Sequence, residues 1–388
     1  MMIMFFMSGC IQYITICLVP IYVSDLPFTD SVSVGLVMAV TSLISAVAQP
    51  LWGIVADRSK TKNRVLSVML LVGAIVIWLL ILPNHVALLS LLPCIILTFS
   101  FITVPTVLSE TIIAENYPTT GMRFSAIKSF TSWGASFIAF ALFIINRYFV
   151  VQTKHIFIIV SLLLMLSLIP LKFIPPTAGH GHVKATGRKV TLKDILNNKQ
   201  LVLVLCFGLF HVMCTSCYST FFTTYYTTQQ GLGAGPSLFS LYYTISIMGE
   251  AVFMLFGSKL IGRFKVHSAL LMGPLAGIGR CFVVYFSPNP YIMMSTVVFQ
   301  ALMVGPLSSK LVVHIQDIVP SEMRATGLSL WSFMSSGICA ILGSSLSGVI
   351  VKTVGIHNLF LVIGAAMFLV FVVFGLLFRR HRILDDTT

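Results

Sequence analysis

The sequence predicts an all-α membrane protein with twelve transmembrane helices in two pseudo-symmetric six-helix bundles and both termini in the cytoplasm. Three observations support this prediction. First, the 388 residues are 57% hydrophobic and only 9% charged, with a mean hydropathy of +0.99, which is far more apolar than a water-soluble domain of this length. Second, long apolar runs recur along the chain, and third, the basic residues gather on one side of them.

Each of twelve apolar runs is long enough to cross a hydrocarbon core of roughly 30 Å at about 1.5 Å per residue. Six runs fall in an N-terminal bundle, residues 1–174, and six in a C-terminal bundle, residues 200–388, which ends in a short cytoplasmic tail. The polar stretch 175–199 is predicted to be a cytoplasmic linker. In order, the runs cover residues 2–24, 32–56, 65–83, 86–113, 124–146, 156–174, 200–226, 236–261, 268–287, 291–316, 325–351 and 358–378.

The orientation of the bundles follows from the 24 lysines and arginines. Three are predicted to lie inside the membrane, namely Lys128, Arg280 and Lys310, and three lie on one side of it: Arg147, Lys154 and Lys352. The other eighteen lie on the opposite side, which the positive-inside rule assigns to the cytoplasm together with both termini. The net charge of +13 therefore reflects topology, and we expect no nucleic-acid partner.

The two halves of the chain repeat each other. Pro118 precedes a Met-Arg pair at 122–123, and Pro320 precedes a Met-Arg pair at 323–324, an offset of 201 to 202 residues. Arg58 after the second run matches Arg263 after the eighth run at an offset of 205. Similar offsets at matching places indicate an internal duplication, which is a known architecture of transporters.

The segment between the second and third runs resembles a motif of the major facilitator superfamily. Gly53 is followed after three residues by Asp57 and Arg58 and then by clustered basic residues. Lys60 stands where the motif usually has a second glycine. The resemblance covers the whole chain, and it implies that Gly53, Asp57 and Arg58 form a conformational latch between neighbouring helices.

Two charged residues in the C-terminal half occupy matching depths. Glu250 in the eighth run and Arg280 in the ninth lie near mid-membrane, where each ionisable group costs roughly 2.5 to 3.5 kcal/mol to bury. Because arginine stays protonated, Glu250 is the titrating member. Gly249-Glu250 followed by Arg280 is similar to the lactose-permease-like branch, and this resemblance implies a role in proton coupling; the alternative is a static ion pair that fixes helix packing.

A second charged set lies in the N-terminal half, where Glu110 in the fourth run and Lys128 in the fifth share a depth. In lactose-permease-like proteins an acidic and a basic residue on these spans hold sugar hydroxyls, beside a stacking tryptophan. The resemblance therefore implies that Glu110, Lys128 and Trp133 contact solute. Lysine lacks the bidentate fork of arginine, however, so a purely structural ion pair is the alternative.

Four further polar residues are candidates for the solute site. Because spans 1, 4, 7 and 10 line the cavity in the family that this chain resembles, the resemblance favours Gln12, His211 and Gln300 as lining residues. Lys310 in the tenth run is also assigned to the solute site, with a lysine that snorkels toward the helix end as the alternative.

Other classes of protein fit the sequence poorly. No HExxH, GxSxG or glycine-rich phosphate signature is present, so we do not expect an enzyme. All eight cysteines fall within apolar runs, and Cys214-x-x-Cys217 has no second pair. We therefore expect no disulfide framework, metal or cofactor.

The expected function is proton-coupled import of a small polar solute, such as a sugar or a nucleoside, by alternating access. The alternatives are a proton-driven exporter of drug-like amphipathic compounds and a non-transporting receptor with a transporter fold. The expected partners are the solute, the proton or a sodium ion, and the lipid bilayer. We expect a monomer in a plasma membrane, such as a bacterial cell membrane.

Overall fold

The computed structural model describes most of the chain, and the described part is built of helices joined by short turns. It covers residues 1–81, 87–116, 124–148, 153–177, 198–229, 231–253, 264–311, 314–315, 318, 330–331 and 333–380. Most of the predicted linker, residues 178–197, and the tail 381–388 lie outside the described residues.

The described helices of the N-terminal half follow the six predicted runs. They are α1 Met2–Tyr13, η1 Ile14–Leu18, α2 Val19–Ser24, α3 Ser31–Arg58, α4 Lys62–Val76, η2 Ile77–Leu80, α5 Leu88–Ile102, α6 Val104–Asn116, α7 Phe124–Tyr148, α8 Thr153–Leu166 and α9 Leu168–Lys172.

The C-terminal half repeats this arrangement. Its described helices are α11 Lys199–Thr227, α12 Gly235–Val252, α14 Val266–Phe286, α15 Pro290–Met293, η5 Met294–Thr296, α16 Val297–Pro306, η6 Leu307–Leu311, η8 Phe333–Cys339, α19 Ala340–Val354 and α20 Ile356–Arg380.

Within the described residues, ten helical segments are long and apolar enough to cross a membrane. The eighteen-residue helix α12 and the shorter apolar helix Pro290–Pro306 lie where the sequence predicts the eighth and tenth spans. The protein is therefore an all-helical, multi-pass membrane protein, as predicted, while the count of twelve spans stays a prediction.

Polar side chains begin several of these helices at the ends of the bundle. The Asp30 carboxylate accepts a 2.9 Å hydrogen bond from the Ser33 backbone N–H and caps α3. Asn198 caps α11, and Asn289 caps α15, each through two backbone N–H groups. Such caps satisfy the free N–H groups of the first turn and fix where each span starts.

Three spans are interrupted near a proline, which lacks a backbone donor. The first span contains the π-helical turn η1 just before Pro20. The fourth breaks between α5 and α6 beside Pro105, and the tenth breaks between α16 and η6 at Pro306. Pro105 and Pro306 are 201 residues apart, which is the offset of the internal repeat, so the two halves are interrupted at equivalent positions.

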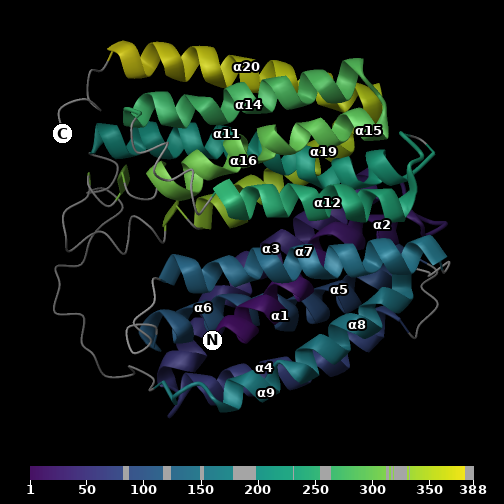
Figure 1. Cartoon of the computed structure of the whole chain (residues 1–388), viewed down its shortest axis with the longest axis vertical. Coiled ribbons are helices and arrows are strands. Elements are labelled where there is room, and N and C mark those ends of the chain that lie inside the picture. The colour runs from purple at the N-terminus through teal and green to yellow at the C-terminus, as the bar shows by residue number, and fades with distance from the viewer. Residues whose placement is uncertain are drawn as a thin grey trace.

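The helices form two groups that meet along a central interface. Figure 1 shows the purple and blue helices α1 to α9 in one group and the helices from α11 onward in the other. Helix α3 packs on α19, and α7 packs on α12. At Gly35 of α3, an added Cβ would lie 2.7 Å from the Ser344 carbonyl oxygen and 3.0 Å from the Gly348 Cα, so the two backbones touch.

The contacts between the groups lie toward the end where α3 begins and α19 finishes. The Ser237 hydroxyl donates to the Phe143 carbonyl at 3.2 Å, and Lys352 Nζ lies 3.4 Å from an Asp30 carboxylate oxygen. On the opposite end of α3, an added Cβ at Gly53 would meet no atom within 4 Å. The two groups are therefore in contact, and the interface is closed, at the end where α3 begins and α19 finishes.

Within each group, the first and fifth spans are joined by a matched contact. The Cys10 thiol donates to the Gly134 carbonyl at 3.1 Å, and the Cys217 thiol donates to the Gly343 carbonyl at 3.1 Å. Gly9 and Gly134 permit this approach, because an added Cβ at either would lie 1.9 Å from a carbonyl oxygen of the other helix. The duplication therefore preserves packing as well as sequence.

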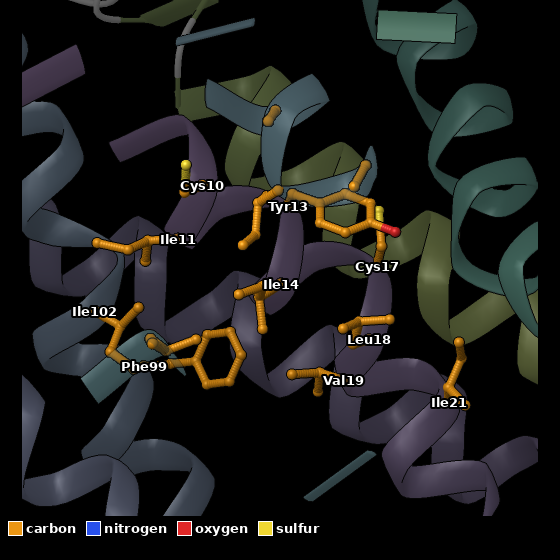
Figure 2. Packing of buried hydrophobic residues seen from close by; sticks show 14 of the residues in the cluster. Cys10, Ile11, Tyr13, Ile14, Cys17, Leu18, Val19, Ile21, Phe99 and Ile102 are labelled. Carbon is orange, nitrogen blue, oxygen red and sulfur yellow. The ribbon is translucent and has the colours of Figure 1, made fainter. Parts of the chain in front are cut away.

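The core of the N-terminal group surrounds the first span. Figure 2 shows Ile14, Leu18 and Val19 among buried apolar side chains that include Phe99 and Ile102 of α5. Tyr13 and Cys17 belong to the same buried cluster, and both also line the cavity described next. The π-helical turn thus places one face of this span in the core and another on a cavity.

Candidate functional site

A central cavity lies between the two groups and divides into two lobes. The first lobe has a volume of about 360 Å³ and the second about 380 Å³. Both are lined by Gln12 and Ile16 of the first span, Thr131 of α7 and Ser219 of α11. These four residues mark the junction at which one solute can contact both lobes.

Aromatic side chains define the first lobe, which we call the aromatic lobe. Helices α11 and α12 supply most of these rings, with one from the first span. The rings are Tyr13, Tyr218, Phe222, Phe239, Tyr242 and Tyr243. They pack against one another, for example Phe222 and Tyr242 with ring centroids 5.3 Å apart. Flat rings of this kind offer stacking faces to a ring-shaped solute.

Arg280 of α14 lies in the wall of the aromatic lobe and is only 4% exposed. Its Nη1 donates to Gln300 Oε1, and its Nη2 donates to the Tyr242 hydroxyl at 2.5 Å. The guanidinium carbon lies 4.3 Å from the Tyr218 ring centroid and 5.3 Å from that of Phe222. Hydrogen bonds and cation–π contacts therefore hold this buried charge in place.

The Tyr242 hydroxyl connects Arg280 to a second helix. It lies 3.3 Å from Thr296 Oγ1, and the Thr296 hydroxyl donates to the Met293 carbonyl at 2.7 Å. Because the Thr296 proton is used in that bond, Tyr242 is the donor to Thr296. A continuous chain of donors thus runs from Arg280 to the backbone of α15.

Glu250 of α12 lines the same lobe, as its predicted depth required. Among the described residues, however, no ion pair joins Glu250 to Arg280. The arginine instead uses its two terminal nitrogens for Gln300 and Tyr242. The sequence placed the two charges correctly in one region, but the expected direct pair is absent from this conformation.

Hydroxyl side chains define the second lobe, which we call the hydroxyl lobe. It lies mainly between the first, second, fourth, seventh and eleventh spans and includes Glu110 of α6. Nine of its hydroxyls donate to carbonyls of their own helix, such as Thr41 to Met38 at 2.8 Å. These nine are Thr15, Thr41, Ser42, Ser45, Thr103, Thr106, Ser219, Thr220 and Ser344.

The direction of those bonds sets what the hydroxyl lobe offers to a solute. A hydroxyl has one donor proton and two lone pairs, so a hydroxyl that donates to its own helix keeps only acceptor capacity. The Glu110 carboxyl group lines the same lobe. These nine hydroxyls are therefore suited to solute groups that donate, such as the hydroxyls of a sugar.

The structure brings several predicted site residues together. Gln12 lines both lobes, Glu250, Arg280 and Gln300 line the aromatic lobe, and Glu110 lines the hydroxyl lobe. These residues come from five different spans.

Other predicted residues lie elsewhere. His211 lines a separate cavity of about 300 Å³ with Met303, and its Nε2 is 3.1 Å from the Met303 carbonyl oxygen. Trp133 lies outside the lining of both lobes and is 42% exposed. Lys310 lies in η6, half-buried and outside the lining of the lobes. These three residues thus lie outside both lobes in this conformation, and their contact with solute stays a prediction.

The latch and the fifth-span lysine are only partly described. Gly53 lies within α3, and Arg58 is exposed at its end. The side chains of Asp57 and Lys128 lie outside the described residues. A latch between these residues and a neighbouring helix stays a prediction, as does the contact between Lys128 and solute.

Sequence reasoning missed Tyr218 and Phe222, the two rings beside Arg280, and most of the hydroxyl lobe. A signal for the hydroxyl lobe was present, because Thr41, Ser42 and Ser45 recur at three- and four-residue spacing along the second run. Helical spacing places such residues on one face. Tyr218, Phe222 and Tyr226 also recur every four residues in the seventh run, but Phe221 and Tyr225 have the same spacing, so spacing alone does not identify the rings that line the cavity.

Comparisons with known proteins agree with this architecture. The chain is 22% identical over 371 residues to the maltose permease of Geobacillus stearothermophilus, covering 94% of this chain and 90% of that protein. It is 21% identical over 350 residues to the uncharacterized transporter YwbF of Bacillus subtilis (strain 168), covering 89% and 85% respectively.

Solved structures share the fold. The nucleoside transporter NupG matches with a TM-score of 0.81 at 18% identity, covering 97% of this chain and 98% of that one. A D-xylose-proton symporter matches with a TM-score of 0.71 at 13% identity, covering 96% and 95%. The model of the MFS_1 like family matches residues 2–362. The chain therefore belongs to the MFS_1 like family and is a major facilitator superfamily transporter, not an enzyme.

Proposed function

We propose that the protein is a proton-coupled importer of a small polar solute of the sugar or nucleoside class. The observation that carries this proposal is the bilobed cavity between the two helix groups, with stacking rings in one lobe and hydrogen-bond acceptors in the other. Sugars and nucleosides combine a ring face with several hydroxyl donors, which matches both lobes. The names of the similar proteins, a maltose permease, a nucleoside transporter and a D-xylose-proton symporter, support the same solute class.

The proposal includes a specific topology. Twelve spans form two bundles, residues 1–174 and 200–388, joined by a cytoplasmic linker at 175–199, with both termini in the cytoplasm of a bacterial cell. The transporter acts as a monomer. The two bundles rock about the central cavity so that it opens to one side at a time.

Glu250 is the proposed proton carrier. Its carboxyl group lines the aromatic lobe, and Arg280 in the wall of that lobe keeps its positive charge throughout the cycle. Protonation of Glu250 removes a negative charge from the cavity and permits the loaded transporter to reorient. Symport requires that protonation of Glu250 raise the solute affinity, and the solute then raises the proton affinity by the same factor.

Glu110 and Lys128 are proposed to contact the hydroxyls of the solute from the N-terminal side. Gly53, Asp57 and Arg58 are proposed to engage a neighbouring helix when the cytoplasmic end closes. Trp133, His211 and Lys310 would contact solute only in a state other than the one described.

Proteoliposomes containing the wild type or Glu250→Gln test the proposal. The probes are uridine, maltose and D-xylose. Each is added without an imposed proton gradient, once in sodium-free buffer and once with sodium, while external pH and solute uptake are recorded. We expect at least one probe to drive proton uptake by the wild type. Glu250→Gln removes the titrating group while preserving shape, so it should lose proton uptake yet retain solute counterflow. Glu110→Gln is the matched control, because it changes a carboxyl of the other lobe and should leave proton uptake coupled to whatever transport remains.

Three outcomes would contradict the proposal. Solute uptake that depends on sodium and not on protons would show that sodium is the coupling ion. Proton uptake that survives in Glu250→Gln would remove the assigned carrier. A folded wild type that is silent with all three probes and expels amphipathic cations would establish an exporter instead.

A further inference from the structure

The Gln300 side chain offers a donor to the aromatic lobe. Gln300 is half-buried in α16, and its Oε1 accepts a hydrogen bond from Arg280 Nη1. Gln300 also lines the lobe. Among the described residues, no hydrogen bond involves its Nε2.

The identity of the amide atom that faces Arg280 follows from chemistry. A guanidinium group has five N–H donors and no acceptor, so only the oxygen of the Gln300 amide can occupy the position beside Nη1. Arg280 is itself held by Tyr242 and by the rings of Tyr218 and Phe222. The arginine therefore prevents the amide from turning over, and the NH₂ end is left for a ligand.

We infer that Arg280 is a positioning residue that fixes the Gln300 amide, and that Gln300 donates a hydrogen bond to an acceptor oxygen of the solute in the aromatic lobe. This inference rests on the proposed function and deepens it. It predicts a solute with an acceptor, such as a carbonyl or ring oxygen, near the face that stacks on the aromatic lobe. The donor groups of the same solute face the acceptors of the hydroxyl lobe.

This role differs from partnership with Glu250 in proton coupling. A coupling partner would form an ion pair with Glu250, whereas the recorded bonds of Arg280 go to Gln300 and Tyr242. The two roles also differ in what they predict. A positioning residue sets the solute affinity through Gln300, while a coupling partner sets the link between solute and proton movement.

Binding of tritiated uridine, maltose and D-xylose to purified full-length protein in lipid nanodiscs provides the first test. Gln300→Leu removes the donor, and Gln300→Glu keeps the bond to Arg280 but replaces the donor by an acceptor. Both should weaken binding of the active probe roughly tenfold, as expected for loss of one hydrogen bond. Arg280→Met should weaken it similarly, and Arg280→Lys, which keeps a donor-only group, should recover part of the affinity.

The double variant Arg280→Met/Gln300→Leu separates the two roles. If Arg280 acts through Gln300, the double variant binds the probe no more weakly than Gln300→Leu alone, within about twofold. Pairing Arg280→Met with Gln12→Leu, a cavity amide on another span, is the matched control and should give multiplicative losses.

Two results would overturn the inference. One is wild-type affinity in Gln300→Glu. The other is an Arg280→Met protein that binds the probe normally but loses solute-driven proton uptake. Thermal unfolding of solute-free protein adds a test that needs no substrate: the shifts in Tm of Arg280→Met and Gln300→Leu should be non-additive, and additive shifts would also reject the contact. A wild type that binds none of the probes would count against the proposed function, while the thermal comparison would still decide the contact between Arg280 and Gln300.

Discussion

The two lobes of the cavity have similar volumes, about 360 and 380 Å³, but their polar groups are held in place by different kinds of partner. In the aromatic lobe, Arg280 is held by side chains from three other helices. In the hydroxyl lobe, each of nine hydroxyls is held by the backbone of its own helix, as Ser45 is by the Thr41 carbonyl. One lobe thus depends on tertiary packing and the other on local helix geometry.

This difference indicates how each lobe responds to change. A network that spans several helices fails as a unit when one member is lost, because the remaining buried groups have no other partners. Hydroxyls that bond within one turn are independent of each other, so their effects should add. We therefore expect large, coupled effects in the aromatic lobe and small, additive effects in the hydroxyl lobe.

The largest effect is expected for Phe222→Ala. Phe222 is 5% exposed, and its ring packs on Tyr218, Tyr242 and the guanidinium of Arg280. Its removal leaves a cavity beside a buried charge and should destabilise the fold by about 3–5 kcal/mol. Thermal unfolding in detergent checks this. Phe210→Ala is the control on the same helix, because Phe210 is 44% exposed and its loss should have a much smaller effect. Equal losses would contradict the proposed importance of the Arg280 network.

A smaller effect is expected for Tyr242→Phe, which deletes only the hydroxyl that accepts from Arg280 and donates to Thr296. A buried charged donor then lacks one partner, which should cost about 1–3 kcal/mol. Tyr226→Phe is the matched control, since it removes a hydroxyl that, among the described residues, bonds only to the Pro290 carbonyl. Chemical or thermal unfolding should rank Tyr242→Phe below Tyr226→Phe in stability, and the reverse order would break the comparison between the lobes.

The hydroxyl lobe should tolerate single changes. Thr41→Val removes a hydroxyl whose proton already bonds to the Met38 carbonyl, so the fold should lose no more than about 1 kcal/mol. Binding of the active probe should weaken only a few-fold, and Thr41→Ser should restore it because serine keeps the acceptor. Combining Thr41→Val with Ser45→Ala should give additive changes in measured affinity. A tenfold loss from Thr41→Val alone would show that this lobe, too, works as a coupled network.

The same contrast explains what the sequence predicted. Length and hydropathy of the apolar runs were sufficient to predict a multi-pass helical fold, because crossing a bilayer leaves few alternatives for the backbone. The depth of a residue along a span was also predictable, which is why Glu250 and Arg280 were assigned to one region. The resemblance to a known family selected Gln12 and Gln300, and both line the cavity.

The partners of each side chain were less accessible to sequence reasoning. Depth does not fix rotation about the helix axis, so Trp133 was expected in the cavity although it lies outside both lobes. Arg280 was matched with Glu250 by depth and by the resemblance to a known family, whereas its neutral partners Gln300 and Tyr242 come from α16 and α12. Neutral hydrogen-bond acceptors leave no charge pattern in a sequence, and only the packing of the helices identifies them.

The smallest expected effect concerns closure of the hydroxyl lobe, whose flanking helices α3 and α19 are linked at the closed end by Asp30 and Lys352. Hydrogen bonds from Ser33, and then the charge of Lys352, hold the pKa of Asp30 below its ordinary value of 3.8. A lowered pKa means that the stabilisation is present at neutral pH and is lost as the pH falls through the folded-state pKa, below about pH 4. The two side chains are 53% and 64% exposed, so the pair contributes less than about 1 kcal/mol.

Asp30→Asn isolates this charge, because asparagine caps a helix about as well as aspartate. Unfolding measured at neutral and acidic pH should show a slightly smaller acid-induced loss in Asp30→Asn than in the wild type. If this single change instead matched the loss in Tyr242→Phe, closure of the hydroxyl lobe would depend on one exposed ion pair, and the contrast between a coupled and an additive lobe would no longer hold.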